Sequence, residues 1–144
     1  MRQSSRRVKE RLEPSGCATV GNWADWFNGR DSPEVDRLDQ ALGRQDAGLV
    51  PVILTEVLQG FRSDRDFERA RALLVRLPVL SLDLEGHAAA ARLFRRLRSK
   101  GITVRGAIDC IIAQTCIAAG VELLSADLDF APIARHTTLR LCAI

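Results

Sequence analysis

The chain has 144 residues, enough for one compact domain and too few for two. Lys and Arg outnumber Asp and Glu by 21 to 18, but the first fourteen residues, with five basic and two acidic side chains, hold the whole excess. A net-charge argument for nucleic-acid binding would therefore rest on that segment alone. No uncharged run approaches the ~20 residues that a bilayer span needs, and no apolar segment follows the basic N-terminus, so we expect a cytoplasmic protein with no membrane partner.

The chain divides into a short polar extension and one folded domain. Residues 1–15 are mostly charged or polar, lack apolar periodicity and run into a Pro-Ser-Gly break at residues 14–16. Such a segment buries too little apolar surface to fold by itself, so we expect a disordered or loosely ordered basic extension. Residues 16–144 show no internal repeat and no sign of a second domain, and we expect them to form the single folded domain.

Short apolar runs alternate with helical patterns along this domain. Strands are expected at residues 17–20, 49–54, 79–82 and 121–124. Helices are expected at residues 23–27, from 33 to near 43, from the Thr55 cap to near 61, from 63 or 64 to 77, from 83 or 85 to 100, and at 107–119. Because the strands are apolar on both faces and alternate with helices, the pattern is typical of an α/β three-layer domain with a short, mostly parallel central sheet flanked by helices.

Acidic residues follow two of the expected strands and open the apolar helix between them. Glu56 comes directly after the run at 49–54 and its Thr55 cap, and Asp109 lies in the first turn of the helix 107–119. Asp127 and Asp129 follow the last expected strand. Because sites in an open parallel sheet form beyond the carboxyl ends of the strands, we expect these carboxylates to share one crevice.

The clustering of carboxylates indicates a particular chemistry. Neighbouring carboxylates repel one another unless a cation neutralises them, and hard oxygen ligands favour Mg²⁺ or Mn²⁺. Such a cluster suits metal-assisted hydrolysis of a phosphodiester, because the ion activates water, binds the scissile phosphate and offsets charge on the leaving oxygen. Each acid taken singly also has a structural explanation, since Glu56 and Asp109 would stabilise a helix dipole and Asp127 would cap the following turn. The sequence leaves both interpretations open.

Residues for competing chemistries are scarce. We expect the two histidines, His87 and His136, on the surface, and no G-x-S-x-G, H-E-x-x-H or glycine-rich phosphate loop occurs. The four cysteines contain no C-x-x-C pair and two fall within the helix 107–119, so we expect buried free thiols in a reducing compartment.

The helix expected to end at residue 100 has one strongly basic face. Its outward-facing residues are Arg92, Arg95, Arg96, Arg98 and Lys100. Two explanations remain open for this face, which are plain solvation and contact with RNA.

Four segments resemble one known family. They are WADWFNGR at residues 23–30, LTEVLQG at 54–60, GITVRGAIDCIIA at 101–113 and LLSADLDF at 123–130. In this order and spacing they resemble a PIN domain, specifically a VapC-type toxin ribonuclease of a type II toxin–antitoxin system. The resemblance covers the chain from Trp23 to the C-terminus.

The resemblance implies a function, a cofactor and partners. The expected function is Mg²⁺-dependent endoribonuclease activity, with Mn²⁺ as a substitute, that inhibits translation until a cognate VapB-like antitoxin blocks the site; a homodimer is also expected. The second, third and fourth family acids fall on Glu56, Asp109 and Asp127, with Asp129 as an additional metal ligand. Arg105 and Ser125 are expected contacts to phosphate or to the metal-bound water, or else solvated loop positions.

One departure from the family concerns its first acid. The first strand of the family normally ends in Asp, followed by Thr or Ser, two further residues and Trp, and counting back from Trp23 places Thr19 at the acid position. Asp25 is a candidate surrogate in the next helix. Two hypotheses follow: a ribonuclease that works with the remaining acids, and a catalytically impaired PIN domain that only binds antitoxin or RNA. We also expect residues 1–22 to derive from a shifted reading frame or an unusual start.

Overall fold

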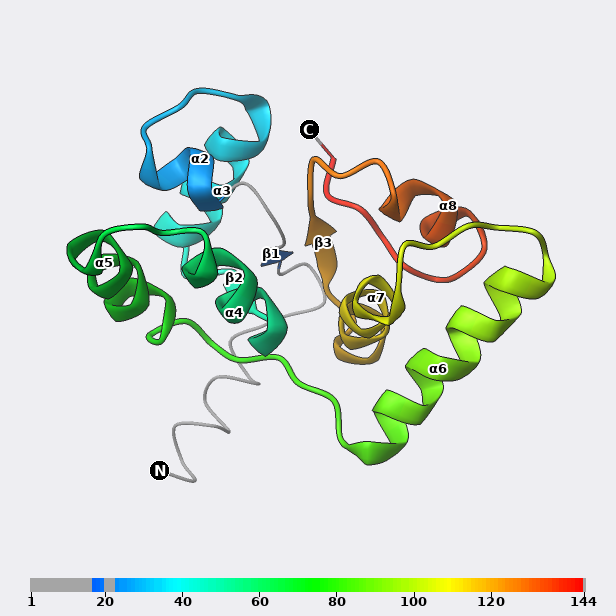
Figure 1. Ribbon diagram of the computed structural model, residues 1–144. Coiled ribbons are helices and arrows are strands. Elements are labelled where there is room, and N and C mark those ends of the chain that lie inside the picture. The colour runs from blue at the N-terminus through cyan, green and yellow to red at the C-terminus, as the bar shows by residue number, and fades with distance from the viewer. Residues whose placement is uncertain (1–16, 20–22, 144) are drawn as a thin grey trace.

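The computed structural model of the chain describes the backbone of residues 17–19 and all atoms of residues 23–143 (Figure 1). The expected extension at residues 1–15 lies outside this part of the chain. In chain order the elements are β1 (Cys17–Thr19), α2 (Trp23–Phe27), α3 (Pro33–Gly43), β2 (Ala47–Leu49), α4 (Pro51–Gln59), α5 (Asp64–Leu74), α6 (Leu84–Ser99), α7 (Ala107–Ala119), β3 (Glu122–Leu124) and α8 (Phe130–Arg135).

The strands form a small parallel sheet in the order β2-β1-β3. The central strand β1 ends at Thr19, which pairs with Leu49 of β2 on one side and Leu124 of β3 on the other. Isolated parallel bridges continue the pattern at Val79, opposite Leu49, and at Leu141, opposite Leu123. The strand expected at residues 79–82 is therefore reduced to a single bridge. Short parallel strands joined through helices give the α/β class that the sequence predicts.

Helix starts follow the capping residues of the sequence. Ser32 Oγ accepts a hydrogen bond of 3.0 Å from the Val35 N–H at the start of α3, and Ser63 Oγ accepts one of 3.1 Å from the Asp66 N–H at the start of α5. At the start of α6, Asp83 Oδ1 accepts a hydrogen bond of 2.7 Å from the Gly86 N–H. Each oxygen satisfies an N–H group that has no partner within the helix.

The expected strand at residues 49–54 is wrong over most of its length. Strand β2 ends at Leu49, and α4 begins at Pro51, which occupies the first helical position. Proline has no N–H to give to a sheet, whereas the first turn of a helix does not need one. Thr55 is consequently inside α4 instead of capping it, and Glu56 lies on the helix and not directly after a strand.

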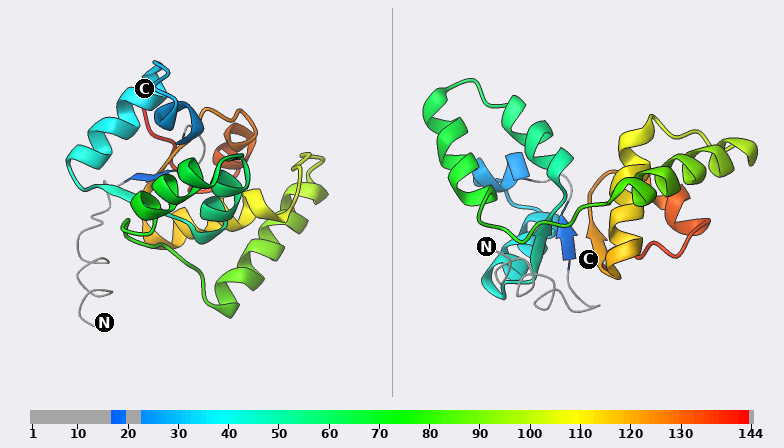
Figure 2. Two further views of the ribbon diagram at one scale, coloured as in Figure 1. Left: turned by 60° about the vertical axis from the view of Figure 1, so that its left-hand side comes forward. Right: turned by 90° about the horizontal axis from the view of Figure 1, so that it is seen from below.

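Helix α7 lies between the sheet and α6, where it packs against β3 and α6 (Figures 1 and 2). Its Cys110, Ile112, Ala113 and Cys116 are buried in the core that also contains Leu97 of α6. The prediction of buried free thiols is confirmed for Cys110, Cys116 and Cys142. Gly120 ends the helix in the left-handed conformation, at φ 68°, which glycine adopts without steric cost.

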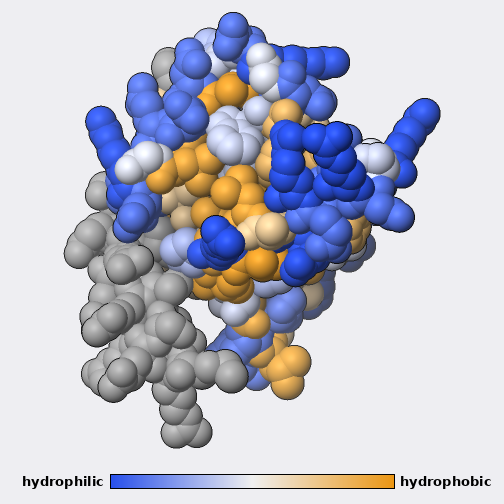
Figure 3. Space-filling model, turned by 90° about the vertical axis from the view of Figure 1, so that its left-hand side faces the viewer, coloured by the Kyte–Doolittle hydropathy of each residue, from blue (hydrophilic) through white to orange (hydrophobic). Residues whose placement is uncertain are grey.

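Helix α8 lies on the same side as α6 and α7, whereas helices α2 to α5 gather at the other side of the molecule (Figure 1). Phe27 of α2 meets Phe61, just after α4, with ring centroids 5.7 Å apart. Figure 3 shows apolar surface on this side, surrounded by polar side chains. Within the described part of the chain, no helix is long and apolar enough to cross a membrane.

Candidate active site

A cleft of about 770 Å³ opens where the start of α7 faces the loop after β3. Its polar side chains are those of Glu56, Arg105, Asp109, Ser125 and Asp127. Apolar atoms come from Ala107, Ile108, Ile112, Ala126 and Phe130. The structure thus brings together five of the six site residues expected from the sequence, although three different segments supply them. Asp129, the sixth, lies beside the cleft and contacts Arg105.

The loop after β3 is shaped by its own side chains. Ser125 Oγ accepts a hydrogen bond of 3.0 Å from the Asp127 N–H, and Asp127 Oδ1 accepts one of 2.9 Å from the Asp129 N–H. Side-chain oxygens that bond the backbone two residues further on hold a tight turn without regular secondary structure. Ser125 therefore orients the loop that presents Asp127, a structural role next to the expected phosphate contact.

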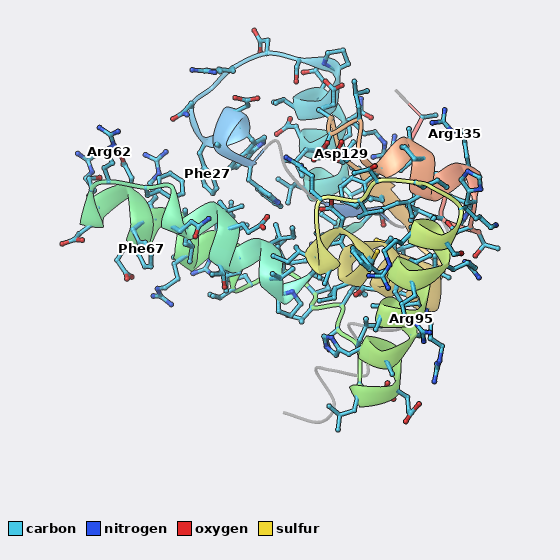
Figure 4. The ribbon with its side chains drawn as sticks, turned by 45° about the vertical axis from the view of Figure 1, so that its right-hand side comes forward. Phe27, Arg62, Phe67, Arg95, Asp129 and Arg135 are labelled. Carbon is cyan, nitrogen blue, oxygen red and sulfur yellow. The ribbon has the colours of Figure 1, made fainter. Side chains whose placement is uncertain are left out.

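Arg105 is the cation of this acidic site. Its Nη2 atom lies 2.6 Å from Asp127 Oδ2, and its Nε atom lies 2.5 Å from Asp129 Oδ2. The arginine side chain is 70% exposed, so solvent weakens both ion pairs and leaves them easy to exchange. The second ion pair holds Asp129, which directly precedes α8 and is labelled in Figure 4, against Arg105.

Asp109 occupies the most enclosed position of the acidic group. It lies in the first turn of α7, where the helix dipole favours a negative charge. Burial raises the pKa of Asp109 most, the Arg105 guanidinium lowers it, and the neighbouring Asp127, Asp129 and Glu56 raise it further. The net pKa is above the ordinary value of 3.8. Its Oδ2 atom is buried and has no hydrogen-bond partner among the described residues.

The acidic residues of the cleft have the donor atoms of a metal centre, but they are not gathered around one point. Within residues 23–143, no three acidic, histidine or cysteine side chains are close enough to hold one ion between them. Arg105 occupies two of the expected ligands, Asp127 and Asp129, and Glu56 reaches the cleft from α4. The donor set is nevertheless all carboxylate oxygen, which suits Mg²⁺ or Mn²⁺, and the unpartnered Asp109 Oδ2 is a buried acceptor of the kind that an ion would satisfy. The chemistry fits a hard divalent cation, and the ligand roles remain a prediction.

The backbone of β1 shows where the first family acid would lie. Thr19 ends the central strand beside Leu124, one residue before Ser125 of the cleft. The strand is therefore present although the residue at its end is not an acid. The candidate surrogate Asp25 lies 3.5 Å from Arg30 in an exposed ion pair and is not among the described residues that line the cleft.

The sequence does not predict the pairing of Arg105 with two of the acids. It predicts for Arg105 only a contact to phosphate or to the metal-bound water, or else a solvated loop position. A signal was available, because Arg105 is the one basic residue between Gly101 and Phe130, a segment with four acidic residues. His87 and His136 are exposed, as predicted, and neither lines the cleft.

Comparisons with known proteins agree with the motifs. Residues 22–136 match the family described as PIN domain. The VapC ribonuclease Mb1587 of Mycobacterium bovis (strain ATCC BAA-935 / AF2122/97) is 31% identical over 121 residues, covering 82% of this chain and 90% of the relative. Ribonuclease VapC11 of Mycobacterium tuberculosis, from strains CDC 1551 / Oshkosh and ATCC 25618 / H37Rv, shows the same identity and coverage.

The chain therefore belongs to the PIN-domain family. Within that family it is of the VapC type, as its motifs predicted. The match includes all four motif segments and every residue of the cleft, and it begins after β1.

Proposed function

We propose that this protein is a metal-dependent endoribonuclease toxin that cleaves RNA and inhibits translation until a VapB-like antitoxin neutralises it. The observation that carries the proposal is the meeting of Glu56, Asp109 and Asp127 in one cleft although they come from three separate segments. The names of the VapC ribonuclease relatives support the choice of RNA as substrate. Mg²⁺ is the proposed cofactor and Mn²⁺ its substitute, and a homodimer is the proposed assembly.

The position of each acid in the cleft indicates its role in holding the cation. Asp109, with its unpartnered oxygen, and Asp127 would hold the cation, with Glu56 and Asp129 as further ligands. When bound, the cation supplies activation of a water molecule and neutralisation of charge on the phosphate. Only the ionised carboxylate ligates a cation, and burial raises the pKa of Asp109, so cation binding should weaken at a higher pH than for an ordinary aspartate as the solution is acidified.

Arg105 changes partners in this proposal. A cation held by Asp127 and Asp129 would replace the guanidinium of Arg105 as the counter-charge of these two carboxylates. The exposed arginine is then free to donate two parallel N–H bonds to a phosphate oxygen pair, the geometry that guanidinium groups favour. Arg105 thus balances the acidic charge before binding and contacts the substrate afterwards.

The apolar surface on the side of α2 to α5 supports the proposal of an antitoxin partner. Phe27, Phe61 and Phe67 are half-buried in the region of α2, α4 and α5, and Phe27 and Phe67 are labelled in Figure 4. Surface of this kind suits the apolar face of an amphipathic partner segment. Antitoxin binding does not depend on Thr19, so it would persist even without cleavage.

A second function is favoured by one observation. Thr19 ends the central strand beside the cleft and carries no charge, and Asp25 is not among the described cleft residues. A protein that lacks one carboxylate of the site would bind antitoxin or RNA without cutting it. The two functions share their partners and differ only in cleavage.

Cleavage of total RNA by the purified protein with Mg²⁺ or Mn²⁺ separates the two functions. We expect cleavage by the wild type, and loss of cleavage in EDTA and in Asp109→Asn. Asp36→Asn is the matched control, because Asp36 also lies in the first turn of a helix but outside the cleft. A folded wild type that leaves RNA intact with either metal would overturn the nuclease proposal in favour of the binding function.

A further inference from the structure

Helix α6 carries a dense group of cations that folding explains only in part. Arg96 and Arg98 lie in its last turn, where the helix dipole favours positive charge, but the basic residues before them have no such reason. Five basic side chains, Arg92, Arg95, Arg96, Arg98 and Lys100, lie within nine residues, all exposed, and we call them the α6 arginine face. No acidic residue occurs between positions 91 and 106. Among the described residues, none of the five forms an ion pair with a carboxylate. Like charges three or four positions apart on a helix repel one another, so the arrangement lowers helix stability.

Helix α5 shows the contrast within the same molecule. It is also rich in arginine, but acidic residues are interleaved with its basic ones over Asp64–Leu74. Arg71 Nε pairs with Glu68 Oε2 at 3.0 Å. Its charges therefore compensate each other, and solvation accounts for them. Solvation alone does not explain why the basic residues of α6 have no acidic residues among them.

The α6 arginine face is hollowed and continues onto α8. One hollow of about 430 Å³ is lined by Ser99 and the four arginines of the face. A second, of about 590 Å³, joins Arg96 and Lys100 to Arg135 and His136 at the end of α8. Figure 4 shows Arg95 and Arg135 on one side of the molecule, opposite Arg62. Concave surface with guanidinium donors on its rim is suited to a chain of anions.

A third hollow includes Arg98 of this face and ends, along the chain, one residue before the acidic cleft. It measures about 290 Å³ and is lined by Phe94, Arg98 and residues 101–104. The next residue, Arg105, lines the cleft. A strand that leaves the cleft over residues 101–105 therefore arrives at Arg98, whose guanidinium lies 5.6 Å from the centre of the Phe94 ring.

We propose that the α6 arginine face is a second RNA-binding surface, which holds backbone phosphates of the substrate beyond the bond that lies in the cleft. The inference rests on the proposed nuclease function and names a site outside its acids. A protein partner fits less well, because no large exposed apolar side chain occurs between residues 91 and 100, whereas protein interfaces have apolar centres. Phosphate contacts of this kind give affinity without sequence preference.

RNA binding in EDTA tests the surface without requiring cleavage. Fluorescence anisotropy is measured with a labelled stem-loop RNA of ~25 nucleotides and with a tetranucleotide, for the variant Arg92→Gln/Arg95→Gln/Arg96→Gln. Loss of three phosphate contacts should weaken stem-loop binding about tenfold or more at moderate salt and lower the log–log salt slope by about 2. Tetranucleotide binding should be weak in EDTA, where Arg105 stays paired with Asp127 and Asp129, and should be unchanged in the variant, since so short a strand does not extend from the cleft to the α6 arginine face.

The matched control is Arg62→Gln/Arg65→Gln/Arg69→Gln, which removes the same charge from the α5 segment, all at exposed positions. It should change stem-loop binding less than twofold. Equal weakening by the two variants would overturn the proposal, because net charge alone would then account for binding. Unchanged stem-loop binding together with lost binding of a polyglutamate peptide would also overturn it and assign the face to an acidic protein partner. If wild-type RNA cleavage fails while the α6 variant still loses stem-loop affinity, the surface stands and the nuclease function falls.

Discussion

Two parts of the molecule differ in how many functional side chains they supply to the site: the segment 105–129 and the central strand β1. The C-terminal wall, residues 105–129, supplies Arg105, Asp109, Ser125 and Asp127, held by a helix start and a self-bonded loop. The central strand β1 contributes less: its backbone pairs with both neighbouring strands, but the residue at its end, next to Leu124, is Thr19 and not an acid. Fold and chemistry are thus separable here, since the sheet keeps its central strand without the acid that the family places on it.

The largest effect is expected from placing an acid at the end of β1. Thr19→Asp adds a carboxylate at the end of the central strand, beside the Leu124–Ser125 segment, and should raise Mn²⁺ affinity and the single-turnover cleavage rate about 10- to 100-fold. Thr19→Asn is the neutral control of the same shape and should leave both unchanged. Equal behaviour of the two variants would show that position 19 does not face the site.

Substitution of Arg105 should change metal binding and RNA cleavage in opposite directions. Arg105→Gln frees Asp127 and Asp129 from their ion pairs, so Mn²⁺ affinity should rise about threefold, a small change because the pairs are exposed. Cleavage should fall about tenfold or more for lack of a guanidinium on the phosphate. Isothermal titration and single-turnover kinetics measure the two effects, with Arg62→Gln as the control. Lower Mn²⁺ affinity in Arg105→Gln would contradict the exchange of partners.

The pH dependence follows from the raised pKa of Asp109, caused mainly by burial. Between the unfolded value of 3.8 and the higher folded value, the native state binds more protons than the unfolded state, so this group lowers stability as pH rises through that window. In EDTA, Asp109→Asn should therefore be more stable than wild type at pH 7, and the difference should shrink toward pH 4. Urea unfolding at both pH values measures it. A constant difference would argue against a raised pKa.

The smallest effect is expected on stability, from a substitution at the end of α7. Gly120→Ala places a side chain at φ 68° at the end of α7, which should cost about 1 kcal/mol of stability. Nothing lies within 4 Å of the added carbon, so the cost is conformational and not steric crowding. Cleavage should be unaffected, since the change is at the opposite end of α7 from Asp109. Thermal unfolding and cleavage assays check the pair of outcomes.

Local sequence signals predicted the C-terminal wall well. The apolar run at residues 107–119, Gly120 after it and the short run at 121–124 describe α7 and β3 closely, because each boundary has a local cause. Asp109 and Asp127, which the strand and helix boundaries predict in one crevice, both line the cleft, and so do Arg105 and Ser125, which only the family resemblance indicated. Their roles in metal and substrate binding remain predictions.

The α4 segment shows where pattern reasoning fails. An apolar run of six residues reads equally as a buried strand or a helix, and Pro51 was the deciding residue. Glu56 reached the cleft despite that error, because a helix presents its side chain there as well as a strand end would. The pairing of Arg105 with Asp127 and Asp129 depends on tertiary geometry, and spacing of 22 and 24 residues carries no periodic signal.

Mn²⁺ binding by electron paramagnetic resonance tests the central claim most directly, because it needs no knowledge of the RNA target. The account predicts one Mn²⁺ site per chain in the wild type at neutral pH, lost in Asp109→Asn and kept in Asp36→Asn. Equally weak binding by all three proteins would contradict it and show that the acids of the C-terminal wall do not hold a cation without the first carboxylate.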